Sequence, residues 1–183
     1  MPSQKVWQDD LAQHEVTVIY KSDDTRVIRL KHADASSVIY KEQLRDNAVA
    51  RVRHERRILE LLSKVPGVPR LVRDNSQVPA NVLALEDQDC QCSNEVFSPR
   101  SSTQALTRFA IQVTRILREV HQVGVIHKDI TSSNILLLRE SCQPILIDFN
   151  LATTFAEERL WSPAILSRRS SAVDSRYFSV YTD

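Results

Sequence analysis

The chain has 183 residues, of which 42% are hydrophobic and 26% are charged, and this places it in the range of globular proteins. Its 24 basic residues nearly cancel its 23 acidic residues, so the net charge gives no reason to expect a nucleic-acid or anionic-membrane partner. The N-terminus lacks the apolar core of a secretory signal, and no stretch approaches the roughly 18 apolar residues of a membrane-spanning helix. We therefore expect a cytoplasmic globular protein without membrane insertion.

The first elements are three short runs rich in β-branched side chains, at 16–21, 26–32 and 37–43, with polar segments between them. Runs of this length between polar turns predict three strands of an antiparallel meander. Lys41 lies near the end of the third run. By itself, a lysine at a strand end is usually only solvated.

A helix is predicted next, capped by Asp46 or Asn47 and ended by the Val-Pro-Gly sequence at 65–67. Its apolar residues form one stripe at helical spacing: Val52, Ile58, Leu59 and Leu62. Glu55 lies on that stripe. An ionised acid on a buried face needs a partner because an unpaired buried charge is costly. Two partners are open at this point, Lys41 on the sheet and a basic residue on the same helix.

The middle of the chain predicts two more strands, at 68–73 and 81–85, and then a long helix at 101–123. The apolar face of this helix carries Phe109, Val113, Ile116, Leu117 and Val120. Gly124 ends the helix, since glycine adopts the left-handed backbone of a helix terminus at little cost. A short strand at 125–126 follows directly.

The most informative segment reads Val-Ile-His-Lys-Asp-Ile-Thr-Ser-Ser-Asn at 125–134 and continues to Ile-Leu-Ile-Asp-Phe-Asn at 145–150. Apolar runs at 135–138 and 144–147 predict a hairpin with its turn at 139–143. The hairpin delivers four polar side chains at strand ends: His127, Asp129, Asn134 and Asp148. Each alone is read most simply as a core histidine, a turn former or a loop residue. Four of them in this order and spacing indicate a functional site.

The order His-x-Asp-x4-Asn, followed by Asp-Phe, resembles the catalytic loop and magnesium-binding segment of eukaryotic-type protein kinases. More narrowly, the wording of 127–136 and 147–159 is similar to the kinase-like N-terminal domain of large bacterial signalling proteins that continue into ATPase and sensor histidine kinase modules. The resemblance covers about 16–159. It implies an α+β, two-lobe kinase-like fold with an antiparallel-sheet N-lobe and an incomplete helical C-lobe.

The resemblance also divides the chain into four parts: an N-terminal extension (1–15), the N-lobe (16–88), a partial C-lobe with the catalytic loop (89–159) and a divergent tail (160–183). After Arg159 no A-P-E motif and none of the later C-lobe helices can be recognised. We therefore expect a truncated or decayed reading frame, or a fragment that needs a partner. Apolar surface should then be exposed around Phe109 and Ile116.

For the catalytic loop, the resemblance implies that Asp129 orients the attacking hydroxyl, with His127 and Lys128 beside it. Asn134 and Asp148 are implied to bind Mg2+ through oxygen atoms. The cofactors would be ATP and Mg2+.

For the nucleotide, the resemblance implies that Lys41 contacts the α and β phosphates and that Glu55 is its partner. Leu85 would border the adenine pocket, as the start of a hinge. The backbone of Glu86, Asp87 and Gln88 would pair with the base. Because such a hinge recognises adenine through backbone groups, the side chains there carry little information.

Three features depart from the family pattern. The turn at 22–25 contains no glycine, and its two like charges, Asp23 and Asp24, would repel ATP. Thr131 stands where protein Ser/Thr kinases usually carry a lysine. Asn150 replaces the glycine after Asp-Phe, although asparagine tolerates left-handed geometry better than most residues.

Two function classes stay open. The first is an ATP-dependent protein phosphotransferase of the Ser/Thr type acting in signalling, for which the incomplete activation segment favours weak or absent turnover. The second is a non-catalytic, pseudokinase-like interaction module. A small-molecule kinase of the aminoglycoside phosphotransferase type is a further alternative, but those enzymes usually have glycine where this chain has Lys128. The expected partners are ATP and a protein substrate or signalling partner, not nucleic acid.

Overall fold

The computed structural model describes residues 11, 14–32, 36–72, 78–97 and 101–159. The predicted tail at 160–183 and most of the predicted extension at 1–15 lie outside the described residues. The domain limits at 88 and 159 stay predictions.

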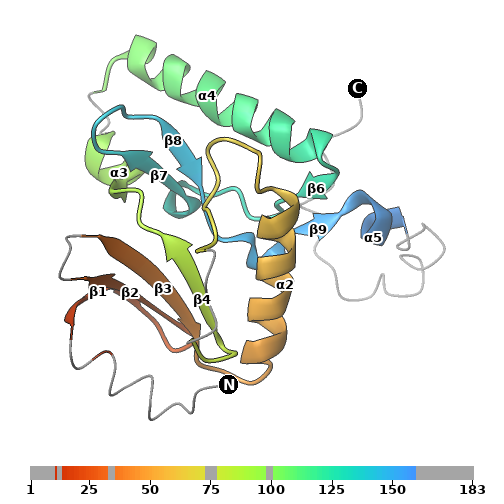
Figure 1. The fold of residues 1–183 in the computed structure, drawn as a ribbon. Helices are drawn as coiled ribbons and strands as arrows, with labels where there is room; N and C mark the ends of the chain where they lie inside the picture. The colour runs from red at the N-terminus through yellow and green to blue at the C-terminus, as the bar shows by residue number, and fades with distance from the viewer. Residues whose placement is uncertain (1–10, 12–13, 33–35, 73–77, 98–100, 160–183) are drawn as a thin grey trace.

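A four-stranded antiparallel sheet forms the first part of the fold, in the order β1-β2-β3-β4 (Figure 1). Its strands are β1 (Glu15–Lys21), β2 (Thr25–Lys31), β3 (Ser37–Gln43) and β4 (Val82–Glu86). The predicted meander is confirmed. In the register of the sheet, Lys41 lies opposite Val27 on one side and Leu83 on the other. Successive side chains of a strand point to opposite faces, so Ser37, Ile39 and Lys41 share one face.

The helix α2 (Ala48–Leu61) lies against β3 and β4. Its cap differs from the prediction, because Asn47 has the left-handed backbone (φ 65°) and its side chain makes no capping bond within the described part of the chain. The prediction of a full strand at 68–73 was wrong. Only the single bridge between Leu71 and Leu85 forms, and Arg73 lies outside the described residues.

The second part of the fold begins with β5 (Cys90–Cys92), α3 (Ser93–Val96) and α4 (Thr103–Gln122). The remaining elements are β6 (Val125–Ile126), β7 (Ile135–Leu138), β8 (Pro144–Leu146), β9 (Thr153–Thr154) and α5 (Phe155–Arg159). Two short 3-10 turns, Ser132–Asn134 and Phe149–Leu151, lie between them. Strands β5, β7 and β8 form one small antiparallel sheet, and β6 pairs with β9. The predicted hairpin is β7–β8.

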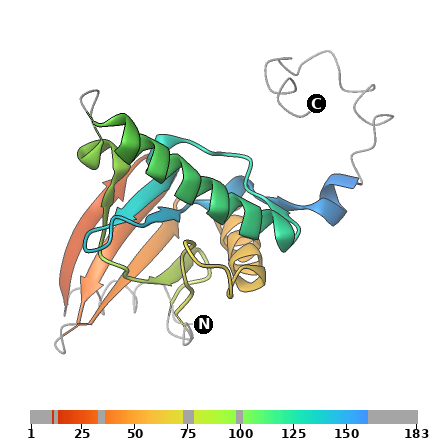
Figure 2. The same ribbon diagram turned by 90° about the horizontal axis from the view of Figure 1, so that it is seen from above.

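The predicted long helix is confirmed as α4, which begins after Ser102, whose side chain accepts a hydrogen bond from the backbone of Ala105. It packs on β8 and β6, and Figure 2 shows it lying along the β7–β8 hairpin. Gly124, with φ +86°, follows its end as predicted. Within the described ranges, no helix has both the length and the apolar character needed to cross a membrane.

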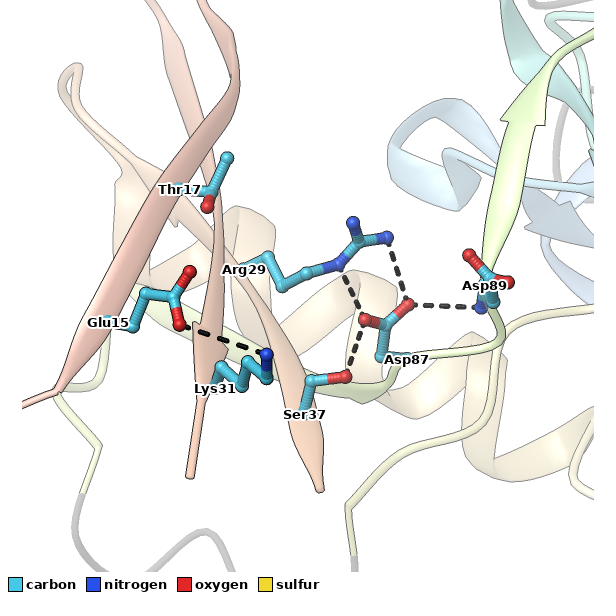
Figure 3. A pocket seen from close by; sticks show the side chains of 7 residues that line it. All are labelled: Glu15, Thr17, Arg29, Lys31, Ser37, Asp87 and Asp89. Carbon is cyan, nitrogen blue, oxygen red and sulfur yellow. Dashed lines mark hydrogen bonds and ion pairs between the residues drawn. The ribbon is translucent and has the colours of Figure 1, made fainter. Parts of the chain in front are cut away.

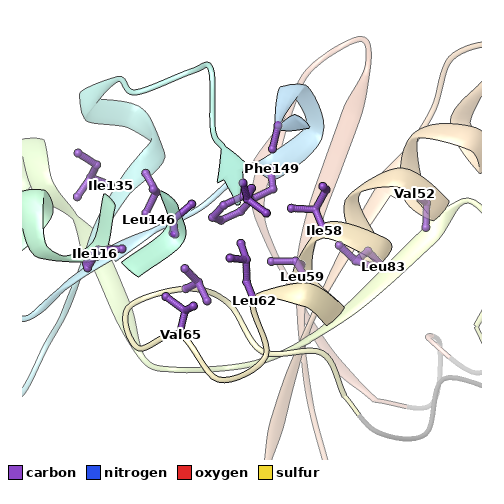
Figure 4. Close-up of a cluster of buried hydrophobic side chains, with 14 residues drawn as sticks. Val52, Ile58, Leu59, Leu62, Val65, Leu83, Ile116, Ile135, Leu146 and Phe149 are labelled. Carbon is purple, nitrogen blue, oxygen red and sulfur yellow. The ribbon is translucent and has the colours of Figure 1, made fainter. Parts of the chain in front are cut away.

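One hydrophobic core joins the sheet, α2, α4 and the hairpin (Figure 4). Its buried members are Val52, Ile58, Leu59, Leu62, Val65, Val68, Leu83, Ile116, Val120, Val125, Ile135, Leu146, Phe149 and Ala152. The exposure expected around Phe109 and Ile116 is found at neighbouring residues of α4 and not at these two side chains. Ile116 is only 8% exposed because the turn around Gly67 covers it, and Phe109 is half-buried; the exposed large apolar residues of α4 are Leu106 and Ile111. The architecture is α+β, as predicted.

Candidate active site

The centre of the site is a buried contact between Lys41 on β3 and Glu55 on α2. Lys41 Nζ lies 2.9 Å from both carboxylate oxygens of Glu55. It also donates to Asp148 Oδ1 at 2.6 Å. Lys41 is therefore the partner of the buried Glu55, as the resemblance implied, while what the pair does stays a prediction. All three N–H donors of the ammonium group have an acceptor.

This network holds two carboxylates and one ammonium group. Burial opposes the charge on Lys41, but the carboxylates of Glu55 and Asp148 outweigh it and raise the pKa of the ammonium group. Burial raises the pKa of Glu55, and the charge of Asp148 adds to that effect while Lys41 opposes it. The three groups together carry an excess of one negative charge, which outweighs burial at Lys41 and adds to burial at Glu55 in favouring protonation. A cation beside Asp148 would relieve that excess.

Asp148 has a left-handed backbone, with φ 67°, and leads into the 3-10 turn that contains Phe149 and Asn150. The backbone N–H of Phe149 donates to Glu55 Oε1 at 3.2 Å. The Phe149 ring is fully buried and packs edge-on against the His127 ring, with 4.6 Å between the two ring centroids. We anticipated a left-handed backbone at Asn150, but the structure has it two residues earlier, at Asp148.

His127 anchors the predicted catalytic loop. Its Nε2 lies 2.9 Å from the carbonyl oxygen of Ile147, and its Nδ1 accepts from the backbone N–H of Asp129 at 3.2 Å. The neutral ring with its proton on Nε2 satisfies both bonds. Burial lowers the pKa of His127, although the Ile147 carbonyl and nearby carboxylates oppose this, so the ring is neutral at pH 7.

Asp129 and Asn134 are joined directly. The side-chain amide of Asn134 donates to Asp129 Oδ2 at 2.8 Å and to the Asp129 carbonyl at 3.0 Å. Lys128, between His127 and Asp129, also has a left-handed backbone, with φ 70°. Its ammonium group pairs with Glu158 Oε1 at 2.5 Å. A catalytic role for Lys128 stays a prediction.

The residues predicted to hold Mg2+ lie at one end of the β7–β8 hairpin. The backbone N–H of Ile147, next to Asp148, donates to the carbonyl of Asn134 at 2.8 Å. Among the residues that the structure describes, no partner binds Asn134 Oδ1 or Asp148 Oδ2, and no cluster of three His, Cys, Asp or Glu side chains is formed. Mg2+ in nucleotide sites takes one or two side-chain oxygens, with phosphates and waters completing its shell. Asn134 and Asp148 fit that chemistry.

The turn at 22–25 fits a phosphate less well. The backbone N–H groups of Asp24 and Thr25 both donate to Ser22 Oγ, at 3.3 and 3.1 Å. They are thus not directed at a ligand, as the N–H groups of a glycine-rich loop are. The repulsion expected from the two aspartates is reduced, because Arg45 pairs with Asp24 and lies 3.9 Å from Asp23.

The predicted hinge begins at the end of β4, which includes Leu85 and Glu86. Leu85 is half-buried against the main core, and the N–H of Glu86 donates to the carbonyl of Arg70 at 2.9 Å, while the role of both residues at adenine stays a prediction. Asp87 Oδ1 accepts a hydrogen bond from Arg29 Nη2 on β2 at 3.2 Å, and Asp87 Oδ2 pairs with Arg29 Nε at 2.6 Å and accepts from Ser37 Oγ at 2.7 Å (Figure 3). Although burial opposes it, these bonds hold the pKa of Asp87 below its ordinary value.

A pocket of about 350 Å³ opens at this cluster (Figure 3). It is lined by Glu15, Thr17, Arg29, Lys31, Ser37, Asp87 and Asp89. Sequence reasoning gave the Asp87 side chain no role and missed Arg29 and Ser37. The available signal was the charge on alternate residues of β2, Arg29 and Lys31, which a strand places on one face.

Sequence reasoning also missed Glu157 and Glu158. Thr154 and Glu157 form a reciprocal pair in which the N–H of Thr154 donates to Glu157 Oε2 at 2.8 Å and the N–H of Glu157 donates to Thr154 Oγ1 at 3.2 Å. This is the capping box, and its Thr-x-x-Glu signature is visible in the sequence.

Comparison with known proteins gives one match over nearly the whole chain and several shorter ones. The profile of the protein kinase domain matches residues 6–179. The chain is 32% identical over 101 residues to the EKC/KEOPS complex subunit BUD32 of Debaryomyces hansenii, covering 54% of this chain and 34% of that protein. It is 33% identical over 87 residues to the mitogen-activated protein kinase p38b of Drosophila melanogaster, covering 48% and 23%.

A third relative, the mitogen-activated protein kinase sty1 of Schizosaccharomyces pombe, is 46% identical over 50 residues, or 27% of this chain and 14% of that protein. The chain thus spans about a third or less of the length of these relatives. The match to the domain profile, by contrast, includes every element of the site described above. The chain belongs to the protein kinase domain family.

Proposed function

We propose that this chain binds ATP with Mg2+ and transfers the γ-phosphoryl group to a Ser or Thr hydroxyl of a protein that acts in signalling. The observation that carries the proposal is the contact of Lys41 with both Glu55 and Asp148, beside the bonded pair Asp129 and Asn134. Phosphoryl transfer depends chiefly on positioning and charge neutralisation, and these residues supply both.

Each residue then has a defined task. Asp129 orients the acceptor hydroxyl and receives its proton as the new O–P bond forms and the bond from the γ-phosphorus to ADP breaks. Lys41 binds the phosphates, and Glu55 fixes the position of its ammonium group. Asn134 and Asp148 hold Mg2+, which neutralises charge on the phosphates. Because every donor of Lys41 already has an acceptor, phosphate binding requires the contact between Lys41 and Asp148 to open or to be shared.

A second candidate is a non-catalytic kinase-like module that binds a partner. The observation that favours it is the turn at 22–25, where the N–H groups of Asp24 and Thr25 are taken by Ser22. Thr131 in place of a lysine points the same way. The relative BUD32 is named as the subunit of a complex, which supports a role alongside a protein partner.

The narrower assignments belong to the same proposal. We place the chain with the kinase-like N-terminal domains of bacterial hybrid signalling proteins, and with them in the cytoplasm, on the wording of the catalytic loop.

A thermal-shift and calorimetric titration with Mg-ATP tests the proposal. Nucleotide at 100 times its dissociation constant should stabilise the wild-type fold by about 2.7 kcal/mol. Lys41→Met should abolish the shift, whereas Lys64→Met, at an exposed position after α2, should retain it. Because Lys41→Met leaves Glu55 buried without its partner, Asp148→Asn serves as a second variant that should also weaken binding of the magnesium complex.

Transfer is measured separately, with labelled ATP and a Ser/Thr peptide mixture. Asp129→Asn should lower the transfer rate by orders of magnitude while Mg-ATP still binds. Binding without transfer in the wild type would favour the interaction module. If the wild type binds no Mg-ATP, the phosphotransferase is excluded and the interaction module would act without a nucleotide.

A further inference from the structure

Two acidic side chains of α5 reach two different parts of the site. Glu157 Oε1 pairs with Arg57 on α2, and Glu158 Oε1 pairs with Lys128 in the catalytic loop at 2.5 Å. Figure 1 shows α5 beyond β9, on the side of the molecule where α2 lies. The proposed function assigns no task to either glutamate.

The segment that carries these glutamates is tied to both halves of the site. His54 Nε2, on α2, lies 2.7 Å from the carbonyl oxygen of Ala152. Strand β9 pairs with β6, which directly precedes His127, and the N–H of Phe155 donates to the carbonyl of Gly124 at 2.8 Å. A shift of α5 would therefore also displace α2 and the catalytic loop.

Glu157 is held in place before it meets Arg57. Its Oε2 accepts from the backbone of Thr154 at 2.8 Å and from the hydroxyls of Thr154 and Thr153 at 3.0 and 3.2 Å. The Thr154 N–H and the Arg57 guanidinium group lower the pKa of Glu157 to about 2, so the carboxylate is ionised at neutral pH. One oxygen caps α5 and the other faces α2.

Both ion pairs, Glu157 with Arg57 and Glu158 with Lys128, lie close in the chain to residues of the proposed active site. Arg57 is two residues from Glu55, which binds Lys41 and the N–H of Phe149. Lys128 directly precedes Asp129 and has a left-handed backbone that few residues adopt without support from their surroundings. Each pair therefore restrains an element that bears part of the site.

We propose that Glu157 and Glu158 are positioning residues that hold α2 and the catalytic loop in the arrangement needed for phosphoryl transfer. In many protein kinases the activation loop is ordered by phosphorylation, through new pairs between arginine and the phosphate. Here two carboxylates supply negative charge at α5, so the arrangement forms without a phosphate group. The consequence for transfer rests on the proposed function, whereas the restraint on the two elements does not.

The test is a double-mutant cycle on unphosphorylated protein, verified by intact mass. Glu157→Gln keeps an acceptor for the cap and removes the charge; Arg57→Gln leaves the cap untouched. Each should raise the dissociation constant of Mg-ATP about two- to fivefold, the range of an exposed ion pair, and the double variant should be no worse than either single variant. Arg57→Lys should restore most of the affinity.

Amide hydrogen exchange supplies a second readout. Both variants should speed exchange at Phe149, whose N–H binds Glu55, without changing exchange in β2 and β3. Glu158→Gln should speed exchange at Asp129, whose N–H binds His127, and lower the transfer rate at saturating ATP with an unchanged dissociation constant. Glu119→Gln breaks the exposed pair with Arg118 on α4 and should change none of these values.

The proposal is overturned if exchange at Phe149 is the same as wild type in Glu157→Gln and Arg57→Gln, or if their effects multiply in the double variant. Wild-type exchange at Asp129 in Glu158→Gln would equally overturn the part that concerns the catalytic loop. If the wild type binds no Mg-ATP but the exchange effects are present, the proposed function fails and the restraint stands.

Discussion

At the scale of single residues, His127 shows how a catalytic-loop side chain is fixed by what surrounds it. Its ring packs against Phe149, and both ring nitrogens bond to the backbone, one to Ile147 and one to Asp129. Protonation would turn the acceptor Nδ1 into a donor that faces the Asp129 N–H. The loop geometry is therefore linked to a neutral ring.

This linkage predicts a pH dependence. The unfolded chain binds a proton at His127 near pH 6.5, and the folded protein binds it only at lower pH, because burial lowers the pKa of the folded ring. The contribution is complete above pH 6.5 and is lost as the pH falls through the folded pKa, so acidification from pH 7 to 5 should lower the free energy of unfolding. An NMR titration of the His127 ring checks this.

Titration of His127 at or above pH 6.5 would contradict that expectation. His127→Phe is the companion variant: it keeps the ring contact with Phe149 but leaves the Asp129 N–H and the Ile147 carbonyl unpaired. It should cost about 1–3 kcal/mol at pH 7 and remove the contribution of His127 to the pH slope.

At the scale of elements, the patterns in the sequence were sufficient for most helices and strands and insufficient for their caps and short pairings. The β-branched runs between polar turns in β1 to β3 and the helical spacing in α2 and α4 predicted those elements within a few residues. The run at 68–73 has the composition of a strand, yet only Leu71 is bridged to β4. Composition does not say how many residues of such a run will pair with the neighbouring strand.

The helix α4 offers a matched test of burial. Ile116 is 8% exposed, and Ile111 on the same helix is 48% exposed. Ile116→Ala should lower the free energy of unfolding by about 2–5 kcal/mol, since it removes buried methylene groups and leaves a cavity. Ile111→Ala should stay within about 0.5 kcal/mol of wild type. Chemical denaturation measures both, and equal losses would show that the exposed face of α4 is covered in solution.

At the scale of the whole molecule, the turn around Gly67 joins the sheet part of the fold to the helical part. Its carbonyl accepts from the N–H of Leu146 on β8 at 2.9 Å. A Cβ at Gly67 would lie 2.5 Å from Ile116 Cδ1, and the residue has φ +77°. The close approach of two distant segments, as well as the left-handed backbone, therefore requires glycine here.

Gly67→Ala should destabilise the protein by more than the 1–2 kcal/mol or so of left-handed strain, because the new methyl group also displaces Ile116. Gly124→Ala is the matched control: its φ is +86°, but the nearest atom is Phe155 Cδ2 at 3.8 Å, so it carries the strain alone. The difference between the free energies of unfolding of the two variants, from thermal or denaturant unfolding, measures the cost of the contact between the new methyl group and Ile116. Equal destabilisation would mean that α4 moves aside freely.

The amino-acid sequence by itself determined the main strands and helices, because these follow from local spacing and composition. Its resemblance to protein kinases supplied the family and the candidate residues from Lys41 to Asp148. Only the tertiary structure decided that Lys41 contacts Asp148 as well as Glu55, that Arg29 and Ser37 hold Asp87, and that Glu157 and Glu158 reach α2 and the catalytic loop. Such contacts join residues far apart in the chain, and the choice among many possible charge partners depends on which surfaces the packed core brings together.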